Sequence, residues 1–341
     1  MPWFTFHLND FAYSFLSVLF EGVPFLLLGS LISGLVDVFV STERMQRLLP
    51  ANRAAAICIS GLLGLIFPMC ECGSVIVIRR FIRKGLPLSV AVTYMLAAPI
   101  VSPLVAISTF AAFRGQNPTA ALHVDATGFM KWYYDHEGAI IMTSLRLTIG
   151  YLVAIAVGFI VHRIPAGALL RPEMLATTPS RRRAGLSISA APAEAQDFSA
   201  IVASANTPKK LLLAVQSSTS DFLEVAFFFV IGTAIASVFN TAVDQTVIQP
   251  LATNPPRAIA ALMGLAIILS VCSTTDAFIA ASFKAFPFAA KLGFLLFGPV
   301  FDLKLFWLYG ILFKRRFVVL LGLGLFLIIW LISWRIAAMQ L

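Results

Sequence analysis

The sequence predicts an all-α integral membrane protein with about eight transmembrane segments in two internal repeats of four. Hydrophobic residues make up 59% of the 341 positions and charged residues only 12%, and the mean hydropathy is +0.91. The apolar residues form runs that can cross a hydrocarbon core of about 30 Å as helices. The runs and their helix breakers also recur at a nearly constant offset, which predicts the two repeats.

The apolar runs define the eight expected spans in order. They cover about 11–40, 54–78, 86–113 and 139–161 in the first half, and about 211–239, 258–283, 286–313 and 317–334 in the second. Residues 163–208 between the halves are rich in Ala, Pro and Ser, and they cannot bury enough apolar surface to fold alone. We therefore predict a first membrane repeat at 1–162, a flexible linker at 163–208 and a second membrane repeat at 209–341.

The Lys and Arg clusters indicate which loops lie in the cytoplasm. Arg79–Lys84 holds four cations in six residues, and the linker carries Arg181–Arg183. We expect both clusters to be cytoplasmic and the acidic loop 114–138 to be external. An even number of spans then puts both termini in the cytoplasm as well, in the plasma (inner) membrane of a prokaryote. Lys314–Arg316 would lie outside in this arrangement, so a re-entrant seventh segment stays open.

The net charge of +9 comes from these short clusters between apolar runs. No basic stripe interleaves with aromatic residues on a polar segment, so we expect no nucleic-acid partner. The first apolar run has no basic leader before it and no small-residue cleavage site after it. We therefore expect it to be a membrane span and not a cleaved signal peptide.

Four of the spans carry helix breakers at mid-depth. They lie near Pro68–Gly73, Pro99–Pro103, Cys272–Asp276 and Gly298–Asp302. Proline removes a backbone donor and glycine relaxes the backbone, so these spans should be broken or re-entrant. Non-helical backbone at membrane depth is stable only where it faces protein or a watery cavity. The breaks therefore predict an internal site.

The two halves match at an offset of about 200 residues. Cys72 pairs with Cys272 and Pro99 with Pro299, and upstream Glu21 pairs with Glu224 at an offset of 203. Transporters are often built from such repeats, with the substrate site at the interface between them. An even number of crossings in each unit would make the repeats parallel, and the position of Lys314 leaves an inverted arrangement open.

We expect the equivalent breaks to meet near mid-membrane and form the substrate site. The candidate substrate-binding residues are Cys70, Glu71, Cys72, Ser74, Pro99, Ser102, Cys272, Ser273, Thr274, Asp276, Pro299 and Asp302. Thiolates select soft, thiophilic ions, so Cys70, Cys72 and Cys272 are the candidate ligands for a metal or metalloid. Carboxylates in membrane spans are costly and therefore indicate function, although buried cysteines also serve as plain packing residues.

Three further acids, Glu21, Asp221 and Glu224, are candidates for proton coupling. Burial in a membrane span favours the protonated form of a carboxyl group, unless a cation pairs with it. The alternative is that each acid only caps a neighbouring broken helix. Arg146, near the outer end of its span, is interpreted as a snorkelling side chain. No nucleotide-binding loop, catalytic constellation or cofactor motif is expected.

The motifs resemble those of the ArsP/YraQ-type permease family. The resemblance rests on Pro-x-Cys-x-Cys-Gly at 68–73, Leu96–Pro99, Cys272–Ser273 followed by Asp276, and Phe297-Gly298-Pro299-x-x-Asp302-Leu303-Lys304. It covers about 11–113 and 211–313. It implies a polytopic permease, and some members of that family export trivalent organoarsenicals while relatives are linked to soft metal ions.

The sequence thus predicts a secondary transporter and not an enzyme. The expected function is efflux of a thiophilic substrate such as a trivalent (organo)arsenical, coupled to protons. A transporter of a soft divalent metal ion, a membrane thiol oxidoreductase and a non-transporting scaffold are the alternatives. The expected partners are the lipid bilayer and a small thiophilic ion or metalloid compound, and a homo-oligomer is compatible with the sequence.

Overall fold

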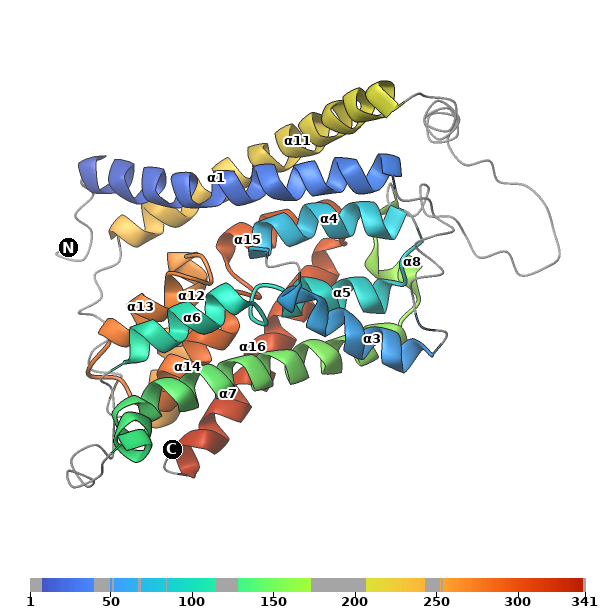
Figure 1. The fold of residues 1–341 in the computed structure, drawn as a ribbon. Helices are drawn as coiled ribbons and strands as arrows, with labels where there is room; N and C mark the ends of the chain where they lie inside the picture. The colour runs from blue at the N-terminus through green and yellow to red at the C-terminus, as the bar shows by residue number, and fades with distance from the viewer. Residues whose placement is uncertain are drawn as a thin grey trace.

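The fold was analysed in a computed structural model that describes residues 8–39, 50, 52–66, 69–83, 85–114, 128–172, 207–242, 252 and 254–339. The named elements in these ranges are all helices (Figure 1). This agrees with the predicted all-α membrane protein. The side chains of Glu21, Asp221 and Glu224 lie outside what the structure describes, as does Pro68.

Four long helices form the frame of the molecule: α1 (Leu8–Phe39), α7 (Gly128–His162), α11 (Thr207–Ala242) and α16 (Arg315–Ala338). Each contains a stretch of 24 to 27 residues that is long and apolar enough to cross a membrane. At 1.5 Å per residue, such a stretch covers the full hydrocarbon thickness of about 30 Å.

Shorter helices fill the space between these four. They are α3 (Arg53–Leu62), η1 (Leu63–Leu65), α4 (Glu71–Arg83), α5 (Leu88–Ala97), α6 (Pro103–Phe113), α8 (Ala166–Leu169), α12 (Pro255–Leu269), α13 (Asp276–Ser282), α14 (Phe288–Phe297) and α15 (Leu303–Leu312). A ten-residue helix is about 15 Å long, about half of a crossing. The expected breaks are therefore present as real interruptions.

The third and seventh expected spans are each broken in the middle. Residues 98–102 separate α5 from α6, and residues 298–302 separate α14 from α15. Pro103 occupies the first turn of α6, where its missing N–H costs nothing. The breaks predicted at Pro99–Pro103 and Gly298–Asp302 are confirmed.

The other two breaks differ slightly from the prediction. The helical part of the second span ends at Leu65 and α4 begins at Glu71, so Cys72 and Gly73 belong to the first turn of α4 and not to the break. In the sixth span α12 ends at Leu269 and α13 begins at Asp276. Ser270 adopts a left-handed conformation with φ 47°, which ends α12.

The first helices of the two halves, α1 and α11, run antiparallel along one face of the molecule (Figure 1). Gly22 of α1 faces the Phe229 ring of α11, while Gly34 faces Ser218, an earlier residue of α11. Later residues of α1 therefore contact earlier residues of α11, which shows that the two helices are antiparallel. Small residues at these positions let the two backbones approach closely.

The last long helices, α7 and α16, are also antiparallel. The segment after α7 reaches the start of α16, where Leu170 forms an isolated bridge with Phe313. The backbone N–H of Lys314 donates to the Leu169 carbonyl at 2.9 Å. Lys314 therefore lies beside the start of the linker.

The second span turns back instead of crossing. Figure 1 shows α3 starting at the end of the molecule where α8 lies, and α4 returning to that same end. Gly64, between the two helices, packs against the Ala98 backbone at the break of α5 and α6, in the middle of the molecule. In the described residues, α3 and α4 therefore form a hairpin in place of the single straight span expected for this run.

The start of α1 and the end of α16 lie at the end of the molecule opposite α8 (Figure 1). The expectation that both termini share the cytoplasmic side with the linker stays a prediction, because the two chain ends and most of the linker lie outside the described residues. Hydropathy counts α3 and α4 as one crossing, whereas the chain reverses direction between them.

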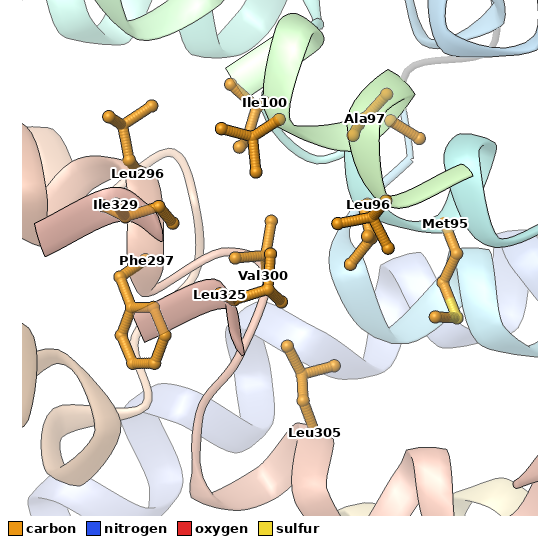
Figure 2. Close-up of a cluster of buried hydrophobic side chains, with 14 of the residues drawn as sticks. Met95, Leu96, Ala97, Ile100, Leu296, Phe297, Val300, Leu305, Leu325 and Ile329 are labelled. Atoms are coloured by element: carbon orange, nitrogen blue, oxygen red, sulfur yellow. The ribbon is translucent and has the colours of Figure 1, made fainter. Parts of the chain in front are cut away.

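The two breaks between half-helices meet in an apolar cluster. Figure 2 shows Leu96 and Ile100 of the first break facing Leu296 and Val300 of the second. A small cavity there is lined by these residues and by residues of α7 and α16. This packing fixes the starts of α6 and α15 near the middle of the molecule.

Candidate functional site

A buried triad of charges joins the two halves. The Lys304 Nζ lies 3.1 Å from Glu71 Oε1 and 3.5 Å from Asp302 Oδ2. All three side chains are at most 3% exposed. Glu71 opens α4, while Asp302 caps α15 by accepting the Leu305 N–H at 2.6 Å. Each carboxylate thus sits at a helix N-terminus, where negative charge is stabilised.

Three thiols lie beside this triad. Cys70 directly precedes α4, and its Sγ accepts the Gly73 N–H at 3.3 Å, as an N-capping side chain would. The Cys72 side chain interacts with that of Cys70. Cys272 lies in the break between α12 and α13, where the Thr274 hydroxyl is 3.8 Å from its sulfur. The four cysteines of the chain form no disulfide, and Cys58 is only partly buried in α3.

Two small cavities border the thiols. One, of about 10 Å³, is lined by Val18, Gly22, Cys70, Glu71, Cys72, Phe229, Cys272 and Lys304. The other, of about 20 Å³, is lined by Met69, Cys70, Ser102, Leu104, Val105, Cys272, Ser273 and Thr274. Each has room for about one water molecule. Cys70 and Cys272 border both cavities, so thiols from the two halves separate them.

A second buried ion pair also joins the halves. Arg146 of α7 is fully buried, and its Nη2 lies 2.6 Å from Asp276 Oδ2 at the start of α13. The same nitrogen donates to the Ser273 carbonyl at 3.0 Å, and Nη1 donates to the Thr109 hydroxyl at 2.8 Å. The snorkelling interpretation of Arg146 is wrong, because its charge is paired inside the protein and does not reach an interface.

The structure brings most of the predicted site residues together. Cys70, Glu71, Cys72 and Cys272 share one cavity, and Ser102, Ser273 and Thr274 line the other. Asp302 reaches the site through Lys304, and Asp276 forms the separate pair with Arg146.

The remaining predicted residues support the backbone. Ser74 is buried and donates to the Glu71 carbonyl at 2.8 Å, so it braces the first turn of α4. Pro99 and Pro299 lie in the turns between half-helices and line neither thiol cavity. Glu21, Asp221 and Glu224 belong to α1 and α11, which also supply Gly22 and Phe229 to the cavity wall.

Lys304 and Arg146 were not predicted as site residues. The available signal was a cation inside an apolar run, in 286–313 and in 139–161. The missing information was the partner, since each cation pairs with an acid from the other half of the chain.

Polar atoms in the site remain without a hydrogen bond. Glu71 Oε2 and Asp302 Oδ2 are buried and accept none in the part of the chain that the structure describes. Within that part, no group of three or more Cys, His, Asp or Glu residues is arranged to hold a metal ion. The site is thus a compact cluster of thiols and paired charges with open acceptor capacity.

Comparison with known proteins adds a family. The profile of the ArsP_1 family, described as "Predicted permease", matches residues 7–127 and 137–337. UPF0718 protein YcgR of Bacillus subtilis (strain 168) is 30% identical over 308 residues, 90% of each chain. A Streptococcus mutans protein described as a "Putative two-component membrane permease complex subunit" is 29% identical over 305 residues, 89% of this chain and 87% of its own. No solved structure matches.

Proposed function

The chain belongs to the ArsP_1 family of predicted permeases, and we propose that it is a secondary transporter that exports a small thiophilic substrate, such as a trivalent (organo)arsenical. The main observation in support is that Cys70 and Cys72 of the first half and Cys272 of the second half line the same buried cavity. A site shared by two halves can be exposed to either side by a relative movement of those halves.

The thiols fit this substrate chemically. A methylarsenite molecule, CH₃As(OH)₂, reacts with two thiols to form two As–S bonds, and the thiol protons leave with the hydroxyl groups as two waters. No oxidant or cofactor is needed. The reaction reverses with water, which a transporter requires for release on the other side.

We further propose that the halves are inverted repeats, with six crossings and two re-entrant hairpins in place of eight spans. The antiparallel pairs α1 with α11 and α7 with α16 support this. The helices α5 and α14 also begin at equivalent positions of the two halves, Leu88 and Phe288. The hairpins are α3 with α4 and α12 with α13. Inverted repeats with broken helices at mid-membrane are typical of secondary transporters.

The cations indicate the orientation of this arrangement. Four parts of the chain that meet at the end of the molecule where α8 lies carry cations (Figure 1). These cations are Arg79, Arg80 and Arg83 in the last part of α4, Arg163 and Arg171 after α7, Lys209 and Lys210 at the start of α11, and Lys314, Arg315 and Arg316 at the start of α16. By the positive-inside rule this end faces the cytoplasm of a prokaryotic cell, together with the linker. The termini and the loop 114–138 then face outward.

The structure corresponds to an occluded state in this proposal. Both ion pairs are closed, and neither thiol cavity exceeds about 20 Å³. Protons would be carried by Glu21, Asp221 and Glu224 on α1 and α11. A second subunit, as the description of the Streptococcus relative says of that protein, or a homo-oligomer would be an additional partner.

Transport into everted vesicles tests the proposal. Methylarsenite, arsenite, Cu and Zn are compared for the parental protein and for Cys70→Ser, Cys72→Ser and Cys272→Ser, with Cys58→Ser as matched control because Cys58 lines neither cavity. Loss of arsenical transport in Cys72→Ser and Cys272→Ser, with retention in Cys58→Ser, supports the proposal. Normal transport in all four variants would leave the cysteines as packing residues. Transport of the metals alone would favour the soft-metal alternative.

Labelling from outside intact cells tests the orientation. A cysteine introduced at Asn117 should react with an impermeant maleimide, whereas one at Ala184 should not. A cysteine inserted directly before Asp10 should also react, because the hairpin topology places the N-terminus outside. Eight simple spans would place it inside, so this position distinguishes the two topologies. Reaction at Ala184 alone would invert the proposed orientation.

A further inference from the structure

We propose that Lys304 selects the class of substrate: its ammonium acts as a tethered cation that keeps metal ions out of the thiol cavity while leaving it open to uncharged thiophilic molecules. This inference rests on the proposed function, because it refines the substrate class of the same site.

The position of Lys304 is the first support. Its side chain lines the cavity that is bordered by Cys70, Cys72 and Cys272. The ammonium lies 3.1 Å from Glu71 Oε1 and 3.5 Å from Asp302 Oδ2. A lysine buried to 2% exposure in a membrane span is costly to keep. A role at the cavity accounts for its presence there.

The number of ligands is the second support. A soft divalent ion such as Zn²⁺ takes four ligands in a closed site. The cavity is lined by three thiols and one carboxylate, Glu71, which are the residue types of such a set. In the described residues no three of these groups are placed to hold a metal ion, so metal binding would require the site to rearrange. The Lys304 ammonium lies 3.1 Å from the Glu71 carboxylate and keeps it from taking part in such a rearrangement.

Charge is the third support. A dication that enters the cavity must approach the fixed ammonium in a buried place, where water screens little of the repulsion. An uncharged trivalent arsenical brings no charge. Phenylarsine oxide, for example, forms two As–S bonds with two thiols and releases one water that carries both thiol protons. The organic group fills the remaining valence of arsenic, so Glu71 can stay paired with Lys304.

Binding to purified protein tests this directly. Zn²⁺ and phenylarsine oxide are measured by equilibrium dialysis on the full chain, for the parental protein, Lys304→Met, Lys304→Arg and Lys291→Met. Lys291 is a matched control, because it is another buried lysine of the second half, with its ammonium 6.0 Å from the Phe113 ring. Lys304→Gln is the second variant if Lys304→Met does not fold, since an amide can still donate to Glu71 without a charge.

The expected result is a gain of function. Lys304→Met should bind Zn²⁺ at least about tenfold more tightly than the parental protein, because one repulsive charge is gone and one carboxylate is released. The gain should vanish on adding Cys72→Ser and persist on adding Cys58→Ser, which assigns it to this cavity. Lys304→Arg and Lys291→Met should exclude Zn²⁺ as the parental protein does.

Two results would overturn the inference: equal Zn²⁺ affinity of the parental protein and Lys304→Met, or an equal gain in Lys304→Arg. The second would show that the packing of Lys304, and not its charge, matters. Failure of the parental protein to bind phenylarsine oxide counts against the proposed arsenical substrate. A Zn²⁺ gain in Lys304→Met would support the inference even then, so the two failures are distinguishable.

Discussion

Replacing Arg146 by Met should destabilise the fold by about 3–5 kcal/mol, because it leaves the Asp276 carboxylate buried without a partner. The guanidinium lies 2.6 Å from that carboxylate, and both side chains are at most 2% exposed. Two unit charges about 4 Å apart attract by about 4 kcal/mol at an effective dielectric constant of 20. The variant also removes the donors to Thr109 and to the Ser273 carbonyl. The estimate follows from this geometry.

The lost free energy of unfolding is measured by equilibrium unfolding in mixed micelles. The measurement is made on both single variants and the double variant, as a double-mutant cycle. Asp276→Leu alone leaves the buried Arg146 guanidinium without its carboxylate partner and should also be destabilising. The double variant Arg146→Met, Asp276→Leu buries no charge and should be more stable than Arg146→Met alone by about 1 kcal/mol or more. Arg163→Met removes an exposed cation just after α7 and should change stability by less than about 0.5 kcal/mol. Strict additivity of the two single losses would refute the argument.

Five other substitutions, with Gly264→Ala as a control, test the helix contacts, the backbone strain and the proton coupling. Gly29→Ala and Gly232→Ala place a Cβ 3.0 Å from Gly73 Cα and 2.9 Å from Lys304 Cα, so each should reduce stability by about 1–3 kcal/mol and slow transport, whereas Gly264→Ala enters open space and should not. Ser270→Val puts a β-branched residue at φ 47° and should cost about 1–3 kcal/mol in the same unfolding assay; an unchanged midpoint would contradict the strain. Glu21→Gln and Glu224→Gln should abolish flux driven by a pH gradient without changing the elution profile, and normal flux in both would exclude proton coupling through this pair.

Local properties of the chain determined much of this protein. The apolar runs fixed an all-α membrane fold, because burial in lipid depends on composition over about twenty residues. Proline and glycine marked the breaks between α5 and α6 and between α14 and α15, since both residues act on their own backbone. Cys70, Cys72 and Cys272 stood out because thiols near helix breaks are unusual in an apolar span.

Only the tertiary structure decided which charges meet. Lys304 and Glu71 are 233 positions apart, and Arg146 and Asp276 are 130 apart. The sequence therefore shows these charges in apolar runs without their distant partners, and the fold shows a triad of Glu71, Lys304 and Asp302 and a pair of Arg146 with Asp276. In the sequence, Glu71 appears as a substrate ligand without a partner. In the structure its carboxylate is paired with the Lys304 ammonium, which limits its binding to a substrate.

The direction in which each helix runs through the molecule also depended on tertiary structure. Hydropathy registers the length of the apolar run from α3 to α4 but not the reversal of direction between them, because a hairpin and a crossing bury similar residues. The backbone hydrogen bond from Lys314 to the Leu169 carbonyl likewise joins two segments that are far apart in the sequence. The apolar composition is a local sum, whereas the direction of each helix is set by its packing against segments far away in the sequence.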